Sequence, residues 1–251
     1  MWSEGSYPLA LPRDFRKDFG PAMAAMIRRG IASPLVVGTI TYDRATDSAF
    51  NSVLMLDAQG AVTGRYDKVR LLAFGEYIPG IDFFPWIRNI IPADAGKFTP
   101  GAGPVVLPLQ GPSGHSWGLG PVICYEDILS GFLRELGALH PNVLVNLTSD
   151  SWFGAGSEPW EHLALAVFAT VELRTAMVRS VNSGVSALID PNGRLLDKTY
   201  ANDPYREPRD ADGILVSAPR MEGGHTFYAQ FGDWFAYLCI IATLWLSLIH
   251  I

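Results

Sequence analysis

The sequence predicts an α/β protein, and three observations lead to that class. Short apolar runs typical of strands alternate with longer amphipathic segments typical of helices, and no internal repeat is present. The length of 251 residues suits one sizeable domain. The hydrophobic content of 49%, against 18% charged residues, is at the apolar end for a soluble protein.

The first half of the chain predicts a helix, a strand, a hairpin and a long insertion. Residues 13–29 place apolar side chains on one side, and Gly30 ends the helix expected there. The run at 34–41 is typical of a strand, and 52–63 of a hairpin that turns near Gly60. Proline and glycine interrupt residues 80–104, so this segment is expected to be an irregular insertion.

The second half continues the alternation of strands and helices. A turn is expected at Pro191-Asn192-Gly193, and an exposed loop at 201–213. The expected strands cover 105–109, 117–124, 142–148, 178–182 and 185–190, and the expected helices cover 127–139 and 160–175.

The C-terminal segment differs from the rest because residues 234–249 carry no charge. Trp234, Tyr237 and Trp245 add aromatic side chains of the kind found at membrane interfaces. With its flanks the run has about 20 residues, near the length that crosses ~30 Å of hydrocarbon. A transmembrane helix over 231–251 is therefore predicted, and a buried core helix is the alternative.

Composition excludes several classes of site and partner. A net charge of −6 without a basic run argues against nucleic acid as a partner. Two cysteines, one of them in the apolar tail, do not make a disulfide framework. No HExxH, CxxC or clustered histidine motif occurs, so no metal site is expected.

Cys124 is the main candidate for chemistry. The apolar residues Val122 and Ile123 lead into it, and the chain turns acidic at Glu126 and Asp127. This pattern predicts a thiol at a strand-to-helix corner, where helix N-terminal N–H groups favour the thiolate. A buried structural cysteine is the alternative, and for a lone cysteine in an apolar run it is the commoner case.

Motifs in a fixed order extend over nearly the whole chain. Two supply further charged groups, Trp2-Ser3-Glu4 and the segment from Tyr66 to Pro79, which contains Lys68 and Phe-Gly-Glu-Tyr. The remaining motifs lie at 124–126, 149–154, 159–163, 179–186 and 228–234. Together they resemble the nitrilase superfamily, whose members use a Glu-Lys-Cys triad, and more narrowly the apolipoprotein N-acyltransferase family.

The resemblance implies a nitrilase-like αββα sandwich over residues 1–222 and a role for each motif residue. Glu4 would be the general base, Cys124 the nucleophile, and Lys68 the stabiliser of the oxyanion, joined by the backbone N–H of Tyr125. The supporting residues would be Glu76, Tyr125 and Glu126, and the acyl pocket would be walled by Trp152 and Phe153. His162 is interpreted as structural, and Arg179 and Asn182 are expected to hydrogen-bond near the site.

The resemblance also implies a two-step reaction without cofactor or metal. Cys124 would take an acyl chain from phospholipid as a thioester and pass it to the N-terminal diacylglyceryl-cysteine of an apolipoprotein. The domain would lie on the periplasmic side of a bacterial inner membrane. The alternative enzyme is a nitrilase-type amidase that hydrolyses a small amide.

The sequence departs from the family at its start. Glu4 stands four residues from the beginning, so the first strand and helix of the nitrilase-like domain are expected to be missing. The family's N-terminal membrane helices are also missing, and they would belong to a separate partner chain. A third hypothesis is therefore an inactive fragment that needs such a partner.

Overall fold

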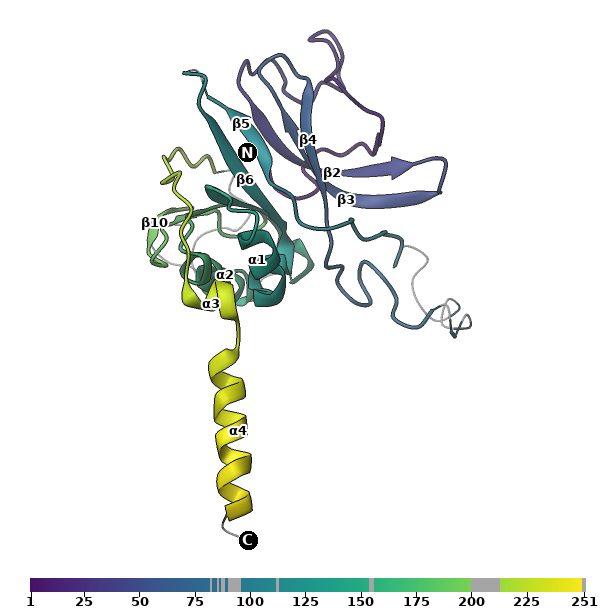
Figure 1. The fold of residues 1–251 in the computed structure, drawn as a ribbon. Coiled ribbons are helices and arrows are strands. Elements are labelled where there is room, and N and C mark those ends of the chain that lie inside the picture. The colour runs from purple at the N-terminus through teal and green to yellow at the C-terminus, as the bar shows by residue number, and fades with distance from the viewer. Residues whose placement is uncertain are drawn as a thin grey trace.

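The computed structural model describes residues 1–81, 83–84, 86, 89, 96–111, 113–153, 156–199 and 213–249. Two β-sheets face each other at its centre, with helices on the outer side of the larger sheet (Figure 1). One hydrophobic core contains side chains from both sheets, among them Met55 and Val122. The α/β class predicted from the sequence is confirmed.

The smaller sheet has the strand order β1-β2-β3-β4. Strand β1 pairs with β2 in parallel, whereas the β2/β3 and β3/β4 pairs are antiparallel. Strands β2 to β4 contain the strand and hairpin expected from the sequence. The bounds are β1 Leu11–Pro12, β2 Leu35–Asp43, β3 Ser48–Leu56 and β4 Val62–Asp67.

The larger sheet has the order β10-β9-β8-β7-β6-β5. Its central strands β6, β7 and β8 run parallel, and the outer pairs are antiparallel. Five of these strands were expected, whereas β10 was not, because its residues are mostly polar or exposed. The bounds are β5 Leu107–Gln110, β6 Ser116–Ile123, β7 Val143–Ser149, β8 Met177–Asn182, β9 Ala187–Ile189 and β10 Leu195–Lys198.

Helices α1 and α2 pack together over the larger sheet (Figure 1). The single helix expected at 127–139 is divided in two, because Leu129 adopts the non-helical angles φ −93° and ψ 89°. The chain that leaves β6 therefore passes through a short 3₁₀ turn before the first α-helix begins. The bounds are η2 Cys124–Ile128, α1 Ser130–Gly137, η3 Ser151–Phe153, α2 Glu158–Leu173 and α3 Phe227–Phe231.

The smaller sheet buries both of its faces, as the alternation along its strands requires. On β3, Val53 and Met55 point into the core between the sheets. Leu54 and Leu56 point outward into a second core that also contains Ile27. Segment 13–34 therefore covers the outer face of this sheet.

That covering segment is not the helix predicted at 13–29. Its backbone groups bond elsewhere, because the Asp18 carboxylate accepts the N–H groups of Phe19 and Ile27 at 2.8 and 2.7 Å. Asp18 also donates its own N–H to the carbonyl of Gly60, across the edge of the sheet. Met26 and Ile27 of the predicted apolar side are buried, whereas Met23 is exposed. Pro21 removes another N–H donor that a helix would need.

The transmembrane helix predicted at 231–251 is not supported. Helix α3 ends at Phe231, Gly232 takes a φ of 61°, and α4 covers only the 16 residues Trp234–Ile249. Within the described ranges, no helix combines the length and hydropathy that a membrane crossing requires. All of α4 is exposed and it projects from the domain (Figure 1).

Two predicted loops lie partly or wholly beyond this description. Of the insertion at 80–104, residues 96–104 contain no helix or strand, and Phe98 forms a single β-bridge to Ala49. The loop predicted at 201–213 lies outside the described residues, except for Gly213.

The Asp18 carboxylate gives a test of how the outer core is held. We expect Asp18→Ala to lower the free energy of unfolding by about 1–3 kcal/mol, because it strands buried N–H donors. Urea denaturation would measure the change, with Asp14→Ala at a nearby exposed position as the matched control. Equal stability of the two variants would contradict this role.

Candidate functional site

Cys124 lies at a sharp corner between β6 and η2, as the sequence predicted. Its φ of 54° is in the left-handed region, which is uncommon for a residue with a side chain. The Asn146 amide holds this corner by donating to the carbonyl oxygen of Cys124 at 3.3 Å. The cysteine is half-buried and free. A strained, fixed backbone that presents a thiol is typical of a nucleophile.

The Glu126 carboxylate joins this corner to the smaller sheet. It is fully buried, and it accepts the hydroxyl of Tyr66 and the N–H groups of Val69 and Arg70 at 2.8–2.9 Å. It also accepts the N–H of Ile123 at 2.8 Å. Burial raises the pKa of Glu126 to about 7, against the effect of these donors. Glu126 thus ties the chain on both sides of Lys68 to the corner at Cys124.

Lys68 follows directly after β4, and its side chain is 1% exposed. Its Nζ lies 2.7 Å from Oε2 of Glu76 and 5.3 Å from the ring centroid of Tyr125. Glu76 also accepts the N–H of Leu72 at 2.8 Å, so it caps a turn as well as pairing with the lysine. The structure therefore brings together Lys68, Glu76 and Tyr125, as predicted.

Glu4 reaches the same place from the N-terminal segment. The Asn51 amide donates to Oε1 of Glu4 at 2.7 Å and to Oε1 of Glu76 at 3.0 Å. One side-chain amide thereby holds both carboxylates beside Lys68. The second oxygen of Glu4 is buried and makes no hydrogen bond of normal geometry among the described residues, although the Ser149 backbone lies close enough to lower the pKa of Glu4.

Close backbone packing positions Glu4, which lies in a turn rather than in a strand. Trp2 donates its N–H to the carbonyl of Val36 at 2.9 Å, and Tyr7 donates to that of Gly38 at 3.2 Å. A Cβ atom on Gly38 would lie 2.4 Å from the carbonyl oxygen of Ser3 and 2.7 Å from Cα of Glu4. Only glycine allows so close an approach between β2 and this turn.

The three charged groups shift one another's pKa values. Burial raises the pKa of Glu4, which Lys68 and Asn51 oppose. Burial alone would lower the pKa of Lys68, but the negative charges of Glu4, of Glu76 and of Cys124 in its thiolate form raise it. Burial and the Glu4 charge raise the pKa of Cys124 to about 12, although Lys68 acts in the opposite direction.

This arrangement suits a nucleophile that is activated during the reaction. At neutral pH the thiol is protonated, because its pKa is far above 7. A neighbouring carboxylate could take the thiol proton, and a fixed ammonium could stabilise the negative charge that develops. The N–H of Tyr125 and the hydroxyl of Thr148 also face the sulfur and favour the thiolate.

Some residues of this site were not identified from the sequence. Asn51 holds the two carboxylates, while Asn146 and Thr148 lie beside Cys124. All three are buried polar residues within strands. A polar residue in an otherwise apolar run of the sequence could therefore have identified them as candidates. A buried polar side chain in an apolar run needs a partner, and here the partners belong to the site.

The predicted pocket residues are less well placed. Trp152 in η3 is 86% exposed. Phe153 is the last residue of η3, and its side chain lies outside the description. Their role in binding an acyl chain stays a prediction.

One group of residues behind Cys124 has the composition of a metal site. Ligand atoms of Asp150, Glu158 and His162 lie within 4.8 Å of one another. Both ring nitrogens of His162 already contact aspartate oxygens, and Arg179 lies 3.6 Å from Asp150. The neighbouring guanidinium supplies positive charge, which makes the group better suited to ion pairing than to a cation.

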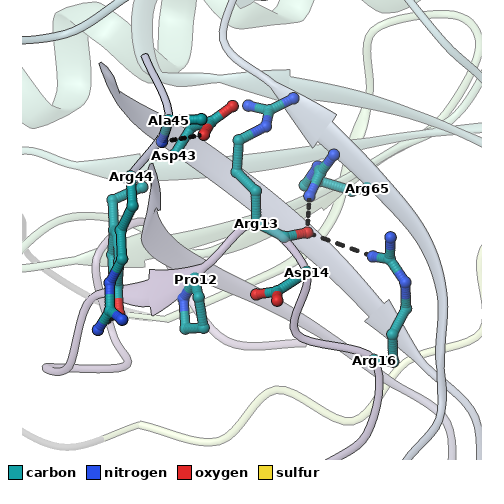
Figure 2. Close-up of a pocket in the computed structure, with 9 residues that line it drawn as sticks. Pro12, Arg13, Asp14, Arg16, Asp43, Arg44, Ala45 and Arg65 are labelled. Carbon is teal, nitrogen blue, oxygen red and sulfur yellow. Dashed lines mark hydrogen bonds between the residues drawn. The ribbon is translucent and has the colours of Figure 1, made fainter. Parts of the chain in front are cut away.

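An arginine-lined pocket lies apart from these residues, on the outer side of the smaller sheet. Figure 2 shows that Arg65 and Arg16 both point toward the carbonyl oxygen of Arg13, to which they donate at 2.7 and 3.2 Å. Arg13 itself pairs with Asp67 at 2.9 Å. The arginines thus bond to their own surroundings, and the pocket contains neither Cys124 nor its partners.

The close approach at Gly38 gives a second test. We expect Gly38→Ala to push the turn at Glu4 away from β2 and to lower the free energy of unfolding by about 1–3 kcal/mol. Gly20→Ala is the matched control, since a Cβ there meets nothing within 4 Å. A crystal structure would show the Glu4–Asn51 hydrogen bond broken. An unchanged bond and unchanged stability would contradict the steric argument.

Curated relatives of the chain are enzymes named apolipoprotein N-acyltransferase. That of Geobacter metallireducens is 31% identical over 246 residues, which cover 96% of this chain and 43% of the relative. That of Bdellovibrio bacteriovorus is 31% identical over 241 residues, with 93% and 42% covered. The chain thus spans about two fifths of the length of these relatives.

A solved amidase from Nesterenkonia sp. AN1 shares the fold, with a TM-score of 0.51 at 17% identity over 82% of this chain and 68% of the amidase. The family profile described as carbon-nitrogen hydrolase matches residues 24–203. That range contains Lys68, Glu76 and Cys124, whereas Glu4 precedes it. The chain therefore belongs to the carbon-nitrogen hydrolase family, and its two facing sheets are the nitrilase-like fold.

Proposed function

We propose that this chain carries the acyl-transfer site of an apolipoprotein N-acyltransferase. The observation that carries the proposal is the convergence of Glu4, Lys68 and Cys124 from three distant segments, linked by Asn51, Glu76 and Glu126. The names of the curated relatives support the same activity. Because the chain covers only about two fifths of these relatives, the proposal concerns the acyl-transfer site.

In the first step, Glu4 takes the proton of the Cys124 thiol as the sulfur attacks a phospholipid ester. The carbonyl oxygen becomes negative and is stabilised by Lys68 and by the N–H of Tyr125. Collapse of this intermediate breaks the ester C–O bond, and Glu4 returns its proton to the leaving alkoxide. The products are an acyl-Cys124 thioester and a lysophospholipid.

In the second step, the free α-amine of a diacylglyceryl-cysteine attacks the thioester. Glu4 takes a proton from the amine, an amide C–N bond forms, and the C–S bond breaks. The proton then returns to the Cys124 sulfur, so the enzyme ends as it began. An amine in place of water is what distinguishes this transfer from the amide hydrolysis that the family name also allows.

The setting we propose is the periplasmic face of a bacterial inner membrane. The exposed helix α4 supports it, because a 16-residue apolar helix with no buried residue needs an apolar partner such as a bilayer. Flotation with anionic and neutral liposomes would test this, with Leu244→Asp as the variant that should weaken binding. Recovery of the wild-type chain away from liposomes would count against the setting.

The acyl-enzyme is the direct test of the chemistry. We expect the Cys239→Ser chain, mixed with liposomes of a phospholipid with deuterated acyl chains, to gain one labelled acyl group on Cys124. Intact-mass and peptide mass spectrometry would detect it, and hydroxylamine should release it. Cys124→Ser and Lys68→Met are expected to show no adduct. The first variant lacks the thiol, and the second lacks the ammonium that stabilises the oxyanion.

The fate of the thioester separates the two enzyme classes. Transfer to a synthetic diacylglyceryl-cysteine peptide supports the acyltransferase, whereas loss to water at the same rate with or without peptide supports a hydrolase. A third outcome is that this chain alone forms no adduct, but that an adduct forms when the unmatched part of a relative is joined upstream of it. This chain would then need a further segment or partner.

The pH dependence of adduct formation tests the role of Glu4 as the base. Acylation requires ionised Glu4, so its rate should rise with pH through a midpoint above the ordinary pKa of a glutamate. The Asn51 hydrogen bond lowers that pKa. Asn51→Leu should therefore move the midpoint to still higher pH, whereas Ser48→Ala at the start of β3 should not. If the rate rises with pH at the same midpoint in the wild type, Asn51→Leu and Ser48→Ala, Glu4 is not the titrating base.

A further inference from the structure

His162 lies buried behind the nucleophile corner, between carboxylates from two other elements. Its Nε2 lies 3.0 Å from Oδ1 of Asp127 in η2, and its Nδ1 lies 3.1 Å from Oδ1 of Asp150, which follows β7. The ring is 7% exposed, and both aspartates are fully buried. A neutral imidazole donates from one nitrogen only, so two carboxylate contacts require a doubly protonated ring.

Counting charges gives the same protonation state. Arg179 from β8 donates to Oδ2 of Asp127 in a very short contact and lies 3.6 Å from Asp150. With His162 protonated, two cations face the two buried aspartates, and the charges of these four groups balance. Glu158 on α2, at 3.7 Å from Nδ1, is the remaining charged neighbour. A neutral histidine would leave a buried carboxylate uncompensated, which is costly.

The group connects to the nucleophile through an unbroken series of hydrogen bonds. Arg179 donates to Oδ1 of Asn146 at 3.1 Å, and the Asn146 amide donates to the carbonyl oxygen of Cys124 at 3.3 Å. Asp127 is also only three residues beyond Cys124 in the same turn. The charged group therefore holds the left-handed corner from two sides.

We propose that His162 is a positioning residue: as an imidazolium it neutralises Asp127 and Asp150 and so holds the corner that presents Cys124. The inference rests on the proposed nucleophilic role of Cys124. The sequence had suggested a structural histidine, and the contacts assign that histidine a specific charge and a connection to the site. The surrounding carboxylates raise the pKa of His162 to about 9 despite its burial.

The protonation state can be read directly from the wild-type chain. We expect ¹⁵N-labelled histidine NMR at pH 7.5 to show both His162 nitrogens protonated, and the signals to be unchanged by EDTA. One unprotonated nitrogen, or a change on adding EDTA, would overturn the proposal. Assignment would use through-space contacts of the buried ring in the wild-type chain, so this readout does not depend on a variant that might fail to fold.

The effect on the nucleophile can be measured without an acyl donor. In a Cys239→Ser background, we expect His162→Gln to slow alkylation of Cys124 by iodoacetamide by about tenfold. His115→Gln, at an exposed histidine, is the matched control and should react like the wild type. An unchanged rate in His162→Gln would overturn the proposal. If alkylation depends on His162 while no acyl adduct forms, the proposed function fails and the positioning role stands.

A pH profile separates this role from simple packing. The folded pKa of about 9 exceeds the ordinary value of 6.5, so the stabilisation is fully present below 6.5 and is lost as the pH rises through 9. The wild type should therefore lose stability between pH 7 and 9 relative to His162→Gln. Parallel profiles for the two proteins would contradict an imidazolium.

Discussion

The buried carboxylate of Glu126 is the constraint on which the site depends. Its donors come from both sheets, since Tyr66, Val69 and Arg70 belong to the smaller sheet and its continuation, and Ile123 ends β6 of the larger one. Lys68 lies inside the bonded segment and Cys124 lies two residues before Glu126. Glu126 therefore restrains the ammonium relative to the thiol, and a buried acceptor with four donors has little freedom to move.

Around this link, the site separates the group that attacks from the groups that activate it. The larger sheet supplies Cys124 on a corner supported by Asn146 and a charged group below it. The smaller sheet supplies Lys68 and, through Asn51, the two carboxylates. Because the thiol is protonated at neutral pH, the roles proposed for Glu4 and Lys68 are to take its proton and to stabilise the negative charge that develops. Facing sheets explain how residues 4, 68 and 124 meet without being near in the sequence.

Much of this arrangement could be predicted from the sequence, and the exceptions have physical reasons. The strand ending at Cys124 followed from the apolar run before it, whereas the supporting role of Glu76 was implied by the resemblance to the nitrilase superfamily. The helix at 13–29 was wrong because Asp18 satisfies backbone donors that a helix would have used, a long-range contact that periodicity does not contain. The spanning helix was not supported because α3 ends at Phe231 and α4 covers only Trp234–Ile249. Asn51 and the Asp127–His162–Asp150 contacts were missed because partners of buried polar residues are set by topology rather than spacing.

A double-mutant cycle on Glu126 and Lys68 tests the central claim most directly. With Cys239 replaced by serine, the alkylation rate of Cys124 would be measured in Glu126→Gln, Lys68→Met and the double variant at one pH. If Glu126 acts by holding Lys68 beside the thiol, the double variant reacts no more slowly than Lys68→Met, and the two effects are not additive. Fully additive losses would show that Glu126 and Lys68 act independently, and would contradict the account.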